Sequence, residues 1–290
     1  MDLSAFAGDV GGVGPVTISG LGSRGGAVPG VRRVAAPAGI DWIQADEMTV
    51  CCGAGTPSAE LEAALGELGQ RVALPPGGTV GGALSAGRSG IRRLGDGPVR
   101  DTLLQARYAA ASGEVVKAGG PTVKNVTGFD LCRLLVGSRG TLGFLGEVIL
   151  RTRPLSRHAQ WFTTAGDPLA TLARLYRPVS VLWDATTTWV LLEGHPADVE
   201  AEATNVGLVP ADGPPALPTG GRWSVPPGEI PALSGTFVAE VGVGIVHHAD
   251  PPPRREIAAA VVELHRRLKD NFDPTGRLNP GVDVLTSDAG

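Results

Sequence analysis

Glycine-rich segments are the part of this sequence whose residue types and spacing could do chemistry. The chain has 43 glycines in 290 residues, above the average usage of about 7% and without a collagen-like period. They gather at 20–30, 77–90, 119–128 and 137–146. Successive backbone N–H groups in such loops can form a nest for an anion. Two nests, at 20–25 and 77–82, could clasp one diphosphate, whereas ordinary turns in a loop-rich protein are the alternative.

The segment 20–25 reads G-L-G-S-R-G and matches the G-x-G-x-x-G fingerprint of Rossmann folds, directly after a predicted strand at 16–19. A Rossmann site also needs a helix that begins at the motif and faces the pyrophosphate. Pro29 and Pro37 follow without an apolar period, so we exclude that fold. The segment 119–125 is not a P-loop, because no glycine precedes Lys124 and no Ser or Thr follows it.

Composition limits the function classes. The 25 basic and 29 acidic residues give a net charge of −4, which argues against nucleic acid as a partner. No apolar run reaches the roughly 18 residues of a spanning helix, and we expect neither a signal peptide nor direct membrane insertion. The cysteines, Cys51, Cys52 and Cys132, form no CxxC pair. We therefore expect no metal or iron–sulfur site and read them as buried thiols of a reducing cytoplasm.

The elements that must position the glycine loops can be placed from the pattern. A helix is expected after Thr56 as N-cap and Pro57 at its first position, ending at Gly69. Strands are expected at 48–52 and 144–153, with a hairpin turning at Ser112-Gly113. The segment 155–250 reads β-α-β-β-α-β, with one strand over 236–247, which is the ferredoxin-like pattern. An amphipathic helix over 257–268 precedes the tail.

Three longer motifs together resemble a known family. They are PPGGTVGGALSAGRSG at 75–90, KNVTGFDL followed by LLVGSRGTLGFLGEV within 124–148, and FDPTGRLNPG at 272–281. Over nearly its whole length the chain resembles the vanillyl-alcohol-oxidase/PCMH-type FAD-binding superfamily, and within it the FAD-binding subunits of bacterial glycolate oxidases. The resemblance implies an α+β fold, in which a PCMH-type two-lobed FAD-binding domain carries an inserted ferredoxin-like small domain. It also implies FAD as cofactor.

The resemblance further implies which residues approach FAD. The first loop would face the diphosphate, the second would pass the flavin and ribityl chain, and the tail would return to the flavin edge. Valine at Gly81 or Gly82 is expected to remove the flavin by blocking its approach and disfavouring positive φ, while the fold remains. The residues carried over are Gly20, Leu21, Gly22, Ser23, Arg24, Gly25, Pro76, Gly77, Gly78, Thr79, Gly81, Gly82, Lys124, Asn125, Gly128, Asp130, Gly137, Ser138, Gly140, Thr141, Gly143, Val148, Asn279 and Pro280.

The sequence departs from the family pattern in two ways. About fifteen residues precede Val16, too few for the strand and helix with which the family usually opens. One face of the first sheet is then bare or covered by a partner, unless residues 1–15 fold back as a short helix. No histidine precedes His158, so we expect FAD to be bound non-covalently.

Oxidation of a 2-hydroxy acid needs a base, a cation for the carboxylate and a hydride acceptor. No catalytic residue can be assigned with the sequence alone. His247 and His248 at the end of a predicted strand are the candidates for the base, and a structural role for both is the alternative. Arg92, Arg93 and Arg100 are candidates for the cation.

We therefore predict an FAD-binding domain at 1–154, a ferredoxin-like cap at 155–250, and a helix and tail at 251–290 that return to the first domain. The predicted function is the FAD-binding subunit of a 2-hydroxy-acid (glycolate-type) dehydrogenase or oxidase complex, accepting or relaying electrons. The implied partners are a larger FAD-dependent catalytic subunit and an iron–sulfur subunit, in the cytoplasm or at the inner face of the membrane through them. The alternative is a non-catalytic scaffold subunit that stabilises those partners.

Overall fold

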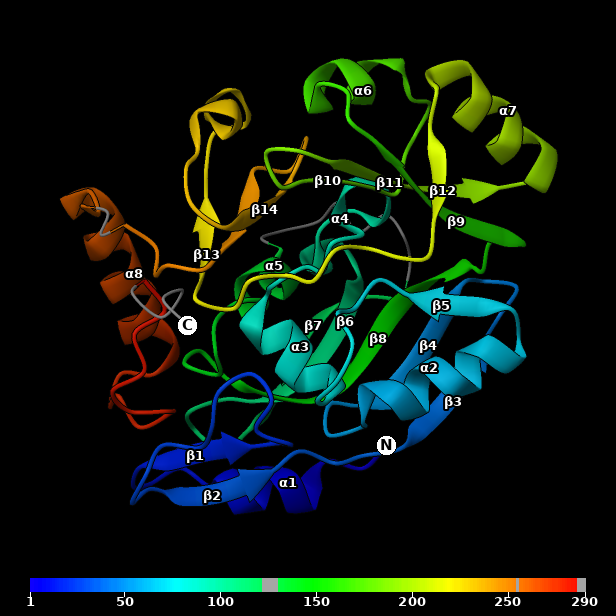
Figure 1. Ribbon diagram of the computed structural model, residues 1–290. Coiled ribbons are helices and arrows are strands. Elements are labelled where there is room, and N and C mark those ends of the chain that lie inside the picture. Colours follow the sequence, from blue (N-terminus) through cyan, green and yellow to red (C-terminus); the bar gives the residue numbers. More distant parts are fainter. Residues whose placement is uncertain (122–129, 254–255, 286–290) are drawn as a thin grey trace. The chain divides into compact units, whose positions relative to one another are not determined.

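A computed structural model describes residues 1–121, 130–253 and 256–285 and divides the chain into two compact units (Figure 1). The first unit consists of Met1–Gly90, Pro98–Leu155 and Ile257–Leu285. The second consists of Ile91–Gly97 and Ser156–Glu256. The short segment Ile91–Gly97 thus groups with the second unit, although it lies within the predicted first domain.

The first unit is built on an antiparallel sheet around the long strand β8 (Phe144–Pro154), which is buried along most of its length. The strand order is β3-β4-β8-β6-β7, and β5 pairs with the last residues of β8. The predicted turn at Ser112-Gly113 joins β6 to β7, which confirms the hairpin. The other strands are β3 (Ile40–Gln44), β4 (Thr49–Gly53), β5 (Gln70–Val72), β6 (Leu103–Ala109) and β7 (Val115–Gly119).

Short helices complete the core of this sheet. They are α2 (Ser58–Glu67), α3 (Val80–Ala86), α5 (Leu131–Leu135) and the single turn η1 (Val99–Asp101). The helix predicted after Thr56 is confirmed as α2, which buries Leu61 and Leu65, whereas Leu68, expected on the same apolar face, is exposed. Its predicted cap is wrong: Pro57 occupies the N-cap position, without a side-chain bond. The Thr56 hydroxyl instead donates to the Gly53 carbonyl at 2.7 Å, so it fastens the turn before the helix.

A smaller layer joins segments from both ends of the chain. Strand β1 (Val16–Ser19) pairs in parallel with β2 (Arg32–Ala35), and Val16 also bridges Leu278. Helix α1 (Ser4–Val10) buries Phe6 and Val10 in the same apolar cluster as Val16, Phe144 and Leu278. Residues 1–15 therefore do fold back as a short helix, the alternative that the sequence left open.

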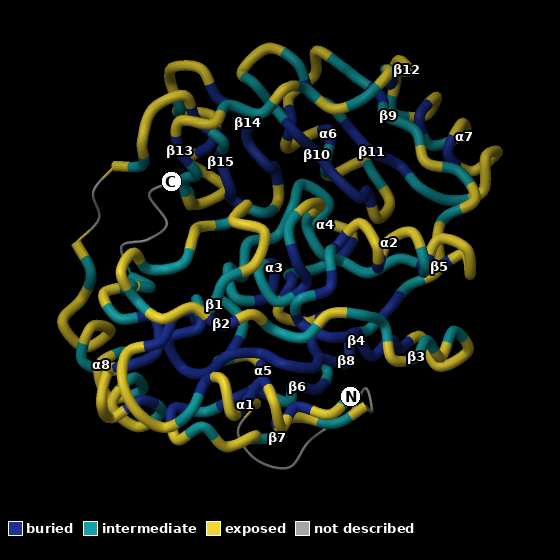
Figure 2. The backbone as a smooth tube through the Cα atoms, turned by 90° about the horizontal axis from the view of Figure 1, so that it is seen from below, coloured by how far each residue is buried: buried dark blue, intermediate teal, exposed yellow. Residues whose placement is uncertain are grey.

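Helix α8 (Ala259–Phe272) forms where it was expected, but none of its residues is buried. Val261, Val262 and Leu264 are exposed, and Figure 2 draws the helix mostly in the colours of exposed and intermediate residues. Its end is fastened by Lys269, whose Nζ donates to the Thr141 carbonyl at 2.8 Å and to the Leu278 carbonyl at 3.0 Å. The polar contacts of Lys269 and the packing of Phe272 against the apolar core thus position the last turn, while Val261, Val262 and Leu264 stay exposed.

The second unit contains one antiparallel sheet of order β12-β9-β11-β10-β14-β15-β13. Its first part, β9-α6-β10-β11-α7-β12, has the β-α-β-β-α-β sequence of a ferredoxin-like unit. The remaining three strands extend the sheet beyond β10. The elements are β9 (His158–Thr164), α6 (Pro168–Arg174), β10 (Ser180–Trp183), β11 (Thr188–Gly194), α7 (Pro196–Val206), β12 (Val209–Ala211), β13 (Gly221–Ser224), η2 (Pro227–Ala232), β14 (Phe237–Glu240), β15 (Ile245–His248) and α4 (Arg93–Asp96).

The expected single strand over 236–247 is wrong. It is a hairpin of β14 and β15, because Gly242 (φ 82°) and Gly244 (φ 80°) adopt left-handed conformations that reverse the chain. The sixth element of the ferredoxin-like pattern is instead β12, within a stretch rich in proline and glycine. In the described part of the chain, no helix combines the length and apolarity that crossing a membrane requires.

Candidate cofactor-binding site

A cavity in the first unit brings together three of the predicted glycine segments and the C-terminal tail. It is lined by residues 18–27, Ala36, Ala54, Gly55, Thr79, Gly81, Gly82, Ser85, Ala86, Arg139, Gly140, Phe144, Leu145, Asn279 and Val282. Strand β1 leads into the first segment, α3 provides the second, and the turn before β8 provides the third. Segments that are remote in sequence thus surround one space.

The first loop presents its backbone to the cavity. Gly22 (φ 72°) and Gly25 (φ 101°) adopt conformations that favour glycine. A Cβ added at Gly22, Gly25 or Gly26 would meet no atom within 4 Å, so these positions border open space. Apart from an isolated bridge between Ser23 and Gly25, the N–H groups of 21–26 have no hydrogen-bond partner among the described residues. They remain able to bind an anion.

The second loop differs from the expectation. Gly77 (φ 80°) and Gly78 (φ 66°) have positive φ, but Gly81 and Gly82 lie inside α3 and do not. The Gly81 N–H donates to the Ala54 carbonyl at 2.7 Å and the Gly82 N–H to Thr79 Oγ1 at 3.1 Å. Because both N–H groups already donate within the protein, the prediction of an anion-binding nest over all of residues 77–82 is wrong.

Gly81 is required by packing. A Cβ there would lie 2.8 Å from the Ala54 carbonyl oxygen and 2.9 Å from the Ala54 Cβ. Valine at Gly81 would therefore push α3 away from residues 54–55, which overturns the expectation that this substitution leaves the fold intact. Gly143 has a comparable role, because a Cβ would collide with the ring of Tyr108.

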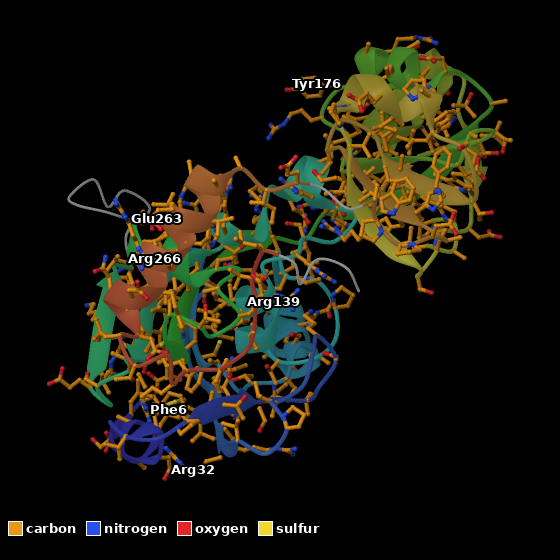
Figure 3. The ribbon with its side chains drawn as sticks, turned by 90° about the vertical axis from the view of Figure 1, so that its left-hand side faces the viewer. Phe6, Arg32, Arg139, Tyr176, Glu263 and Arg266 are labelled. Carbon is orange, nitrogen blue, oxygen red and sulfur yellow. The ribbon has the colours of Figure 1, made fainter. Side chains whose placement is uncertain are left out.

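The cavity carries positive charge. Its charged lining residues are Arg24 and Arg139, and no carboxylate is among the described residues that line it. Arg139 (Figure 3) has φ 51°, an uncommon conformation for a residue with a side chain. Its N–H donates to the Ser85 carbonyl at 2.9 Å and its carbonyl accepts from Asn279 Nδ2 at 2.6 Å. Arg139 was not among the residues predicted from the sequence, although it stands within the glycine motif at 137–143.

Asn279 connects the tail to the cavity wall. Its buried side chain accepts from Thr17 Oγ1 at 2.8 Å and from the Ile18 N–H at 3.2 Å, besides donating to Arg139. The predicted tail residue therefore lines the cavity and also orders two of its walls.

Other predicted contacts lie away from the lining. Asp130 caps α5 by accepting from the Arg133 N–H at 3.2 Å. The hydroxyls of Ser138 and Thr141 donate to carbonyls of their own turn, and Val148 is buried in β8 opposite Cys52. Pro76, Gly137 and Pro280 do not line the cavity. Lys124, Asn125 and Gly128 fall outside the described residues.

The two histidines considered for catalysis are held within the second unit. His248 is buried and stacks on Trp223, with ring centroids 3.9 Å apart. One ring nitrogen lies 3.0 Å from the Ser234 carbonyl, and the other accepts from the Asp250 N–H at 2.8 Å. These contacts favour the structural role for His248, which was the alternative left open by the sequence. His247 Nε2 lies 2.9 Å from Oε1 of the buried Glu240.

Two of the arginines considered as cations for a substrate carboxylate lie next to acidic side chains. Arg92 bonds Asp96 at 3.2 Å and Glu193 at 2.5 Å, within the second unit. Arg100 is exposed and lies 3.9 Å from the Asp101 carboxylate. The charge of Arg92 is therefore balanced by its two neighbours.

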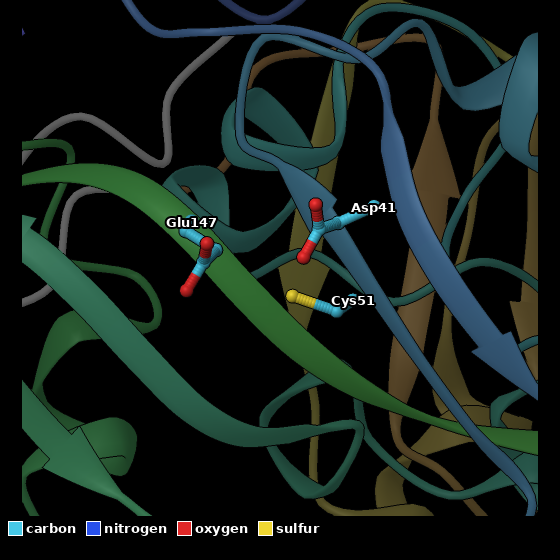
Figure 4. A group of neighbouring side chains, drawn as sticks. All are labelled: Asp41, Cys51 and Glu147. Carbon is cyan, nitrogen blue, oxygen red and sulfur yellow. The ribbon is translucent and has the colours of Figure 1, made fainter. Parts of the chain in front are cut away.

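A cluster of Asp41, Cys51 and Glu147 has potential ligand atoms within 4.8 Å of one another (Figure 4). Glu147 already pairs with the Met1 amino group at 2.7 Å and with Arg107 at 3.3 Å. The same amino group lies 3.6 Å from the Asp41 carboxylate, and burial raises the pKa of the Cys51 thiol to about 12. We therefore interpret this cluster as a set of ion pairs.

Two segments of the chain match families of FAD-dependent proteins. Residues 31–119 match an FAD binding domain, and residues 228–282 match the C-terminal domain of FAD linked oxidases. The chain thus contains sequence typical of FAD-linked oxidases at both of these segments, and it resembles the PCMH-type FAD-binding family. Eight lining residues lie in the first matched segment, namely Ala36, Ala54, Gly55, Thr79, Gly81, Gly82, Ser85 and Ala86, and Asn279 and Val282 lie in the second. The two arginines, the absence of a carboxylate from the described lining residues and the open glycine faces fit FAD, whose diphosphate is anionic.

Known relatives match parts of the chain. Glycolate oxidase subunit GlcE of Escherichia coli is 33% identical over 173 residues, which are 56% of this chain and 49% of that protein. D-lactate dehydrogenase of Archaeoglobus fulgidus is 34% identical over 144 residues, 48% of this chain and 32% of that protein. The chain thus matches half or less of these relatives' lengths.

Two further similarities bear on fold and family. Glycolate oxidase subunit GlcD of Bacillus subtilis is 40% identical over 76 residues, 26% of this chain and 16% of that protein. A solved structure of alkyldihydroxyacetonephosphate synthase has a TM-score of 0.64, covering 91% of this chain and 71% of that one at 16% identity. The last similarity establishes the fold alone.

Proposed function

We propose that the cavity of the first unit binds one FAD non-covalently, with the diphosphate against residues 20–26. The observation that carries this proposal is the lining: two arginines, no carboxylate among the described lining residues, and glycines that border open space. Among the described residues that line it there is no histidine, cysteine or tyrosine. The absence of these nucleophilic side chains from the described wall supports a non-covalent cofactor.

We propose further that the flavin-loaded chain works in a complex that oxidises a 2-hydroxy acid of the glycolate or D-lactate type. A bound flavin supplies a hydride acceptor that can pass electrons onward. The names of the relatives support this substrate class. The partners in the proposal are a larger FAD-dependent catalytic subunit, which the similarity to GlcD supports, and an iron–sulfur subunit. Through them the chain would work in the cytoplasm or at the inner membrane face.

A scaffold role without redox turnover is the second candidate. It is favoured by the histidines, because His248 is committed to structural contacts and His247 to the buried Glu240. In that case the cavity would retain FAD, while the substrate would be oxidised on the partner flavoprotein.

Visible absorption separates the proposals. The purified chain, reconstituted with FAD and desalted, should keep about one flavin per chain, and acid precipitation should release all of it. Colour in the pellet would contradict non-covalent binding, and a colourless folded protein would contradict flavin binding. Anaerobic addition of glycolate or D-lactate to the complex should then reduce this flavin. If only the partner's flavin is reduced, the chain is a scaffold.

A further inference from the structure

Two loops that border the cofactor cavity are joined by one side chain. The Arg24 guanidinium donates from Nη1 to the Gly77 carbonyl at 2.6 Å, and from Nη2 to the Pro75 and Pro76 carbonyls at 3.0 and 2.7 Å. Arg24 belongs to the first loop, which lines the cavity. The three carbonyls belong to the segment that leads into the second loop and α3. One planar group thus holds three consecutive carbonyls of a segment about fifty residues away.

The 75–77 segment depends on such an outside donor. Pro75 and Pro76 have no backbone N–H, so they cannot fasten the segment with their own donors. A second attachment lies at Gly78, whose carbonyl accepts from the Ser58 N–H at 2.8 Å. Arg24 therefore fastens one end of the segment and α2 the other.

Gly78 shows independently that the two loops are fitted to each other. A Cβ at this position would lie 2.5 Å from Arg24 Nη1 and would also collide with the Ser23 hydroxyl. Gly78 also has φ 66°. A side chain here would displace the guanidinium from its carbonyls, so glycine at 78 and arginine at 24 belong to one arrangement.

We infer that Arg24 is a positioning residue, which clamps the first glycine loop onto residues 75–77 and so preforms the cavity for the dinucleotide. This inference rests on the proposed function of the cavity. The clamp depends on the shape of the guanidinium: five donors in a rigid plane can serve three carbonyls at once, whereas an ammonium on a flexible stem cannot. Neutral carbonyls leave the positive charge uncompensated, so the same residue also favours an anion nearby.

The test compares Arg24→Met, Arg24→Lys and the control Arg33→Met. Arg33 is exposed on β2 and does not line the cavity. Hydrogen exchange of the FAD-free proteins should show faster exchange at residues 20–28 and 77–80 in both Arg24 variants and not in the control. This measurement stands even if the chain binds no FAD, so it separates the clamp from the proposed function.

FAD titration then separates the clamp from a pure charge effect. Both Arg24 variants should bind FAD about tenfold or more weakly, and the lysine variant should rescue little of the loss although it keeps the charge. Unchanged exchange in both variants, or full rescue of affinity and exchange by lysine, would overturn the clamp. If a variant does not fold, Gly78→Ala provides the same test, because it displaces the guanidinium without altering Arg24.

Discussion

The Thr17 hydroxyl donates a 2.8 Å hydrogen bond to Oδ1 of Asn279, 262 residues away in the sequence. The same hydroxyl accepts from the Val28 N–H at 3.0 Å, on the far side of the first glycine loop. Asn279 also holds the Arg139 carbonyl. This pair of residues therefore ties the tail, both ends of the first loop and the third cavity segment into one wall.

Replacement of Asn279 by alanine should weaken both the fold and FAD binding. The variant leaves the partners Thr17, Ile18 and Arg139 without their bonds in a buried place, which should lower the free energy of unfolding by about 2–3 kcal/mol. Urea denaturation and FAD titration measure the two effects. The conservative variant Asn279→Asp keeps the acceptor but introduces a carboxylate beside the cavity. If it bound FAD as tightly as the wild type, Asn279 would not border the anionic cofactor.

Gly26→Val should remove FAD while leaving the protein folded. Gly26 lines the cavity, does not have positive φ, and a Cβ there meets nothing within 4 Å. The valine would therefore occupy only the space assigned to the cofactor. Flavin content after desalting and the thermal midpoint measure the two effects.

Two further variants serve as comparisons for Gly26→Val. Gly213→Val, at an open position outside the cavity, should keep both flavin and stability. Gly81→Val should lose stability, because of its contact with Ala54. Full flavin occupancy in soluble Gly26→Val would show that the cofactor lies elsewhere.

Arg139→Gln should weaken FAD binding about tenfold and leave riboflavin binding almost unchanged, because the positive charge that it removes attracts the phosphates, which riboflavin lacks. The decline of affinity with salt should also become shallower. Arg133→Gln, an exposed arginine on α5, is the matched control. An equal loss for FAD and riboflavin would contradict a role at the diphosphate.

The sequence could predict the glycine loops because positive φ and close approach leave few residue types as options. Gly22 and Gly25 meet that requirement and border the cavity. Arg139 could not be assigned in this way. The direction of its side chain depends on a left-handed backbone that Ser85 and Asn279 hold from remote positions. The role of Gly81 was likewise hidden, because it is decided by the proximity of Ala54.

In the second unit, the ferredoxin-like order was readable from periodicity, but two of the strands were not. β12 and β13 lie in a stretch rich in proline and glycine and form through pairing with β9 and β15. Such tertiary pairing overrides a weak local preference. The β14–β15 turn did have a signal in Gly242 and Gly244, since two glycines inside one strand of this length are unfavourable.

At low pH, protonation of the Asp273 carboxylate should weaken the attachment of the C-terminal tail. Burial raises the pKa of its carboxyl, but bonds from Lys269, Leu278 and Arg277 outweigh this and hold the pKa below its ordinary value. A lowered folded pKa contributes stability above the unfolded pKa of about 3.9, and this contribution is lost as the pH falls through the folded value. Asp273→Asn should therefore cost about 2–3 kcal/mol at neutral pH, and the difference from wild type should shrink below about pH 4.

Denaturation of both proteins across pH measures this effect. Asp270→Asn is the control, because Asp270 is exposed on the same helix and pairs only with Arg266 among the described residues. A difference between Asp273→Asn and wild type that stays constant down to pH 2 would contradict the account.

The central claim is that FAD occupies the cavity between residues 18–27, α3 and Asn279. Hydrogen exchange with and without FAD tests it most directly, because the footprint locates the cofactor on the chain. The account predicts slower exchange at residues 20–27, where the N–H groups of the first loop would bind the diphosphate, and at 137–145. FAD binding with unchanged exchange in residues 20–27 would contradict it.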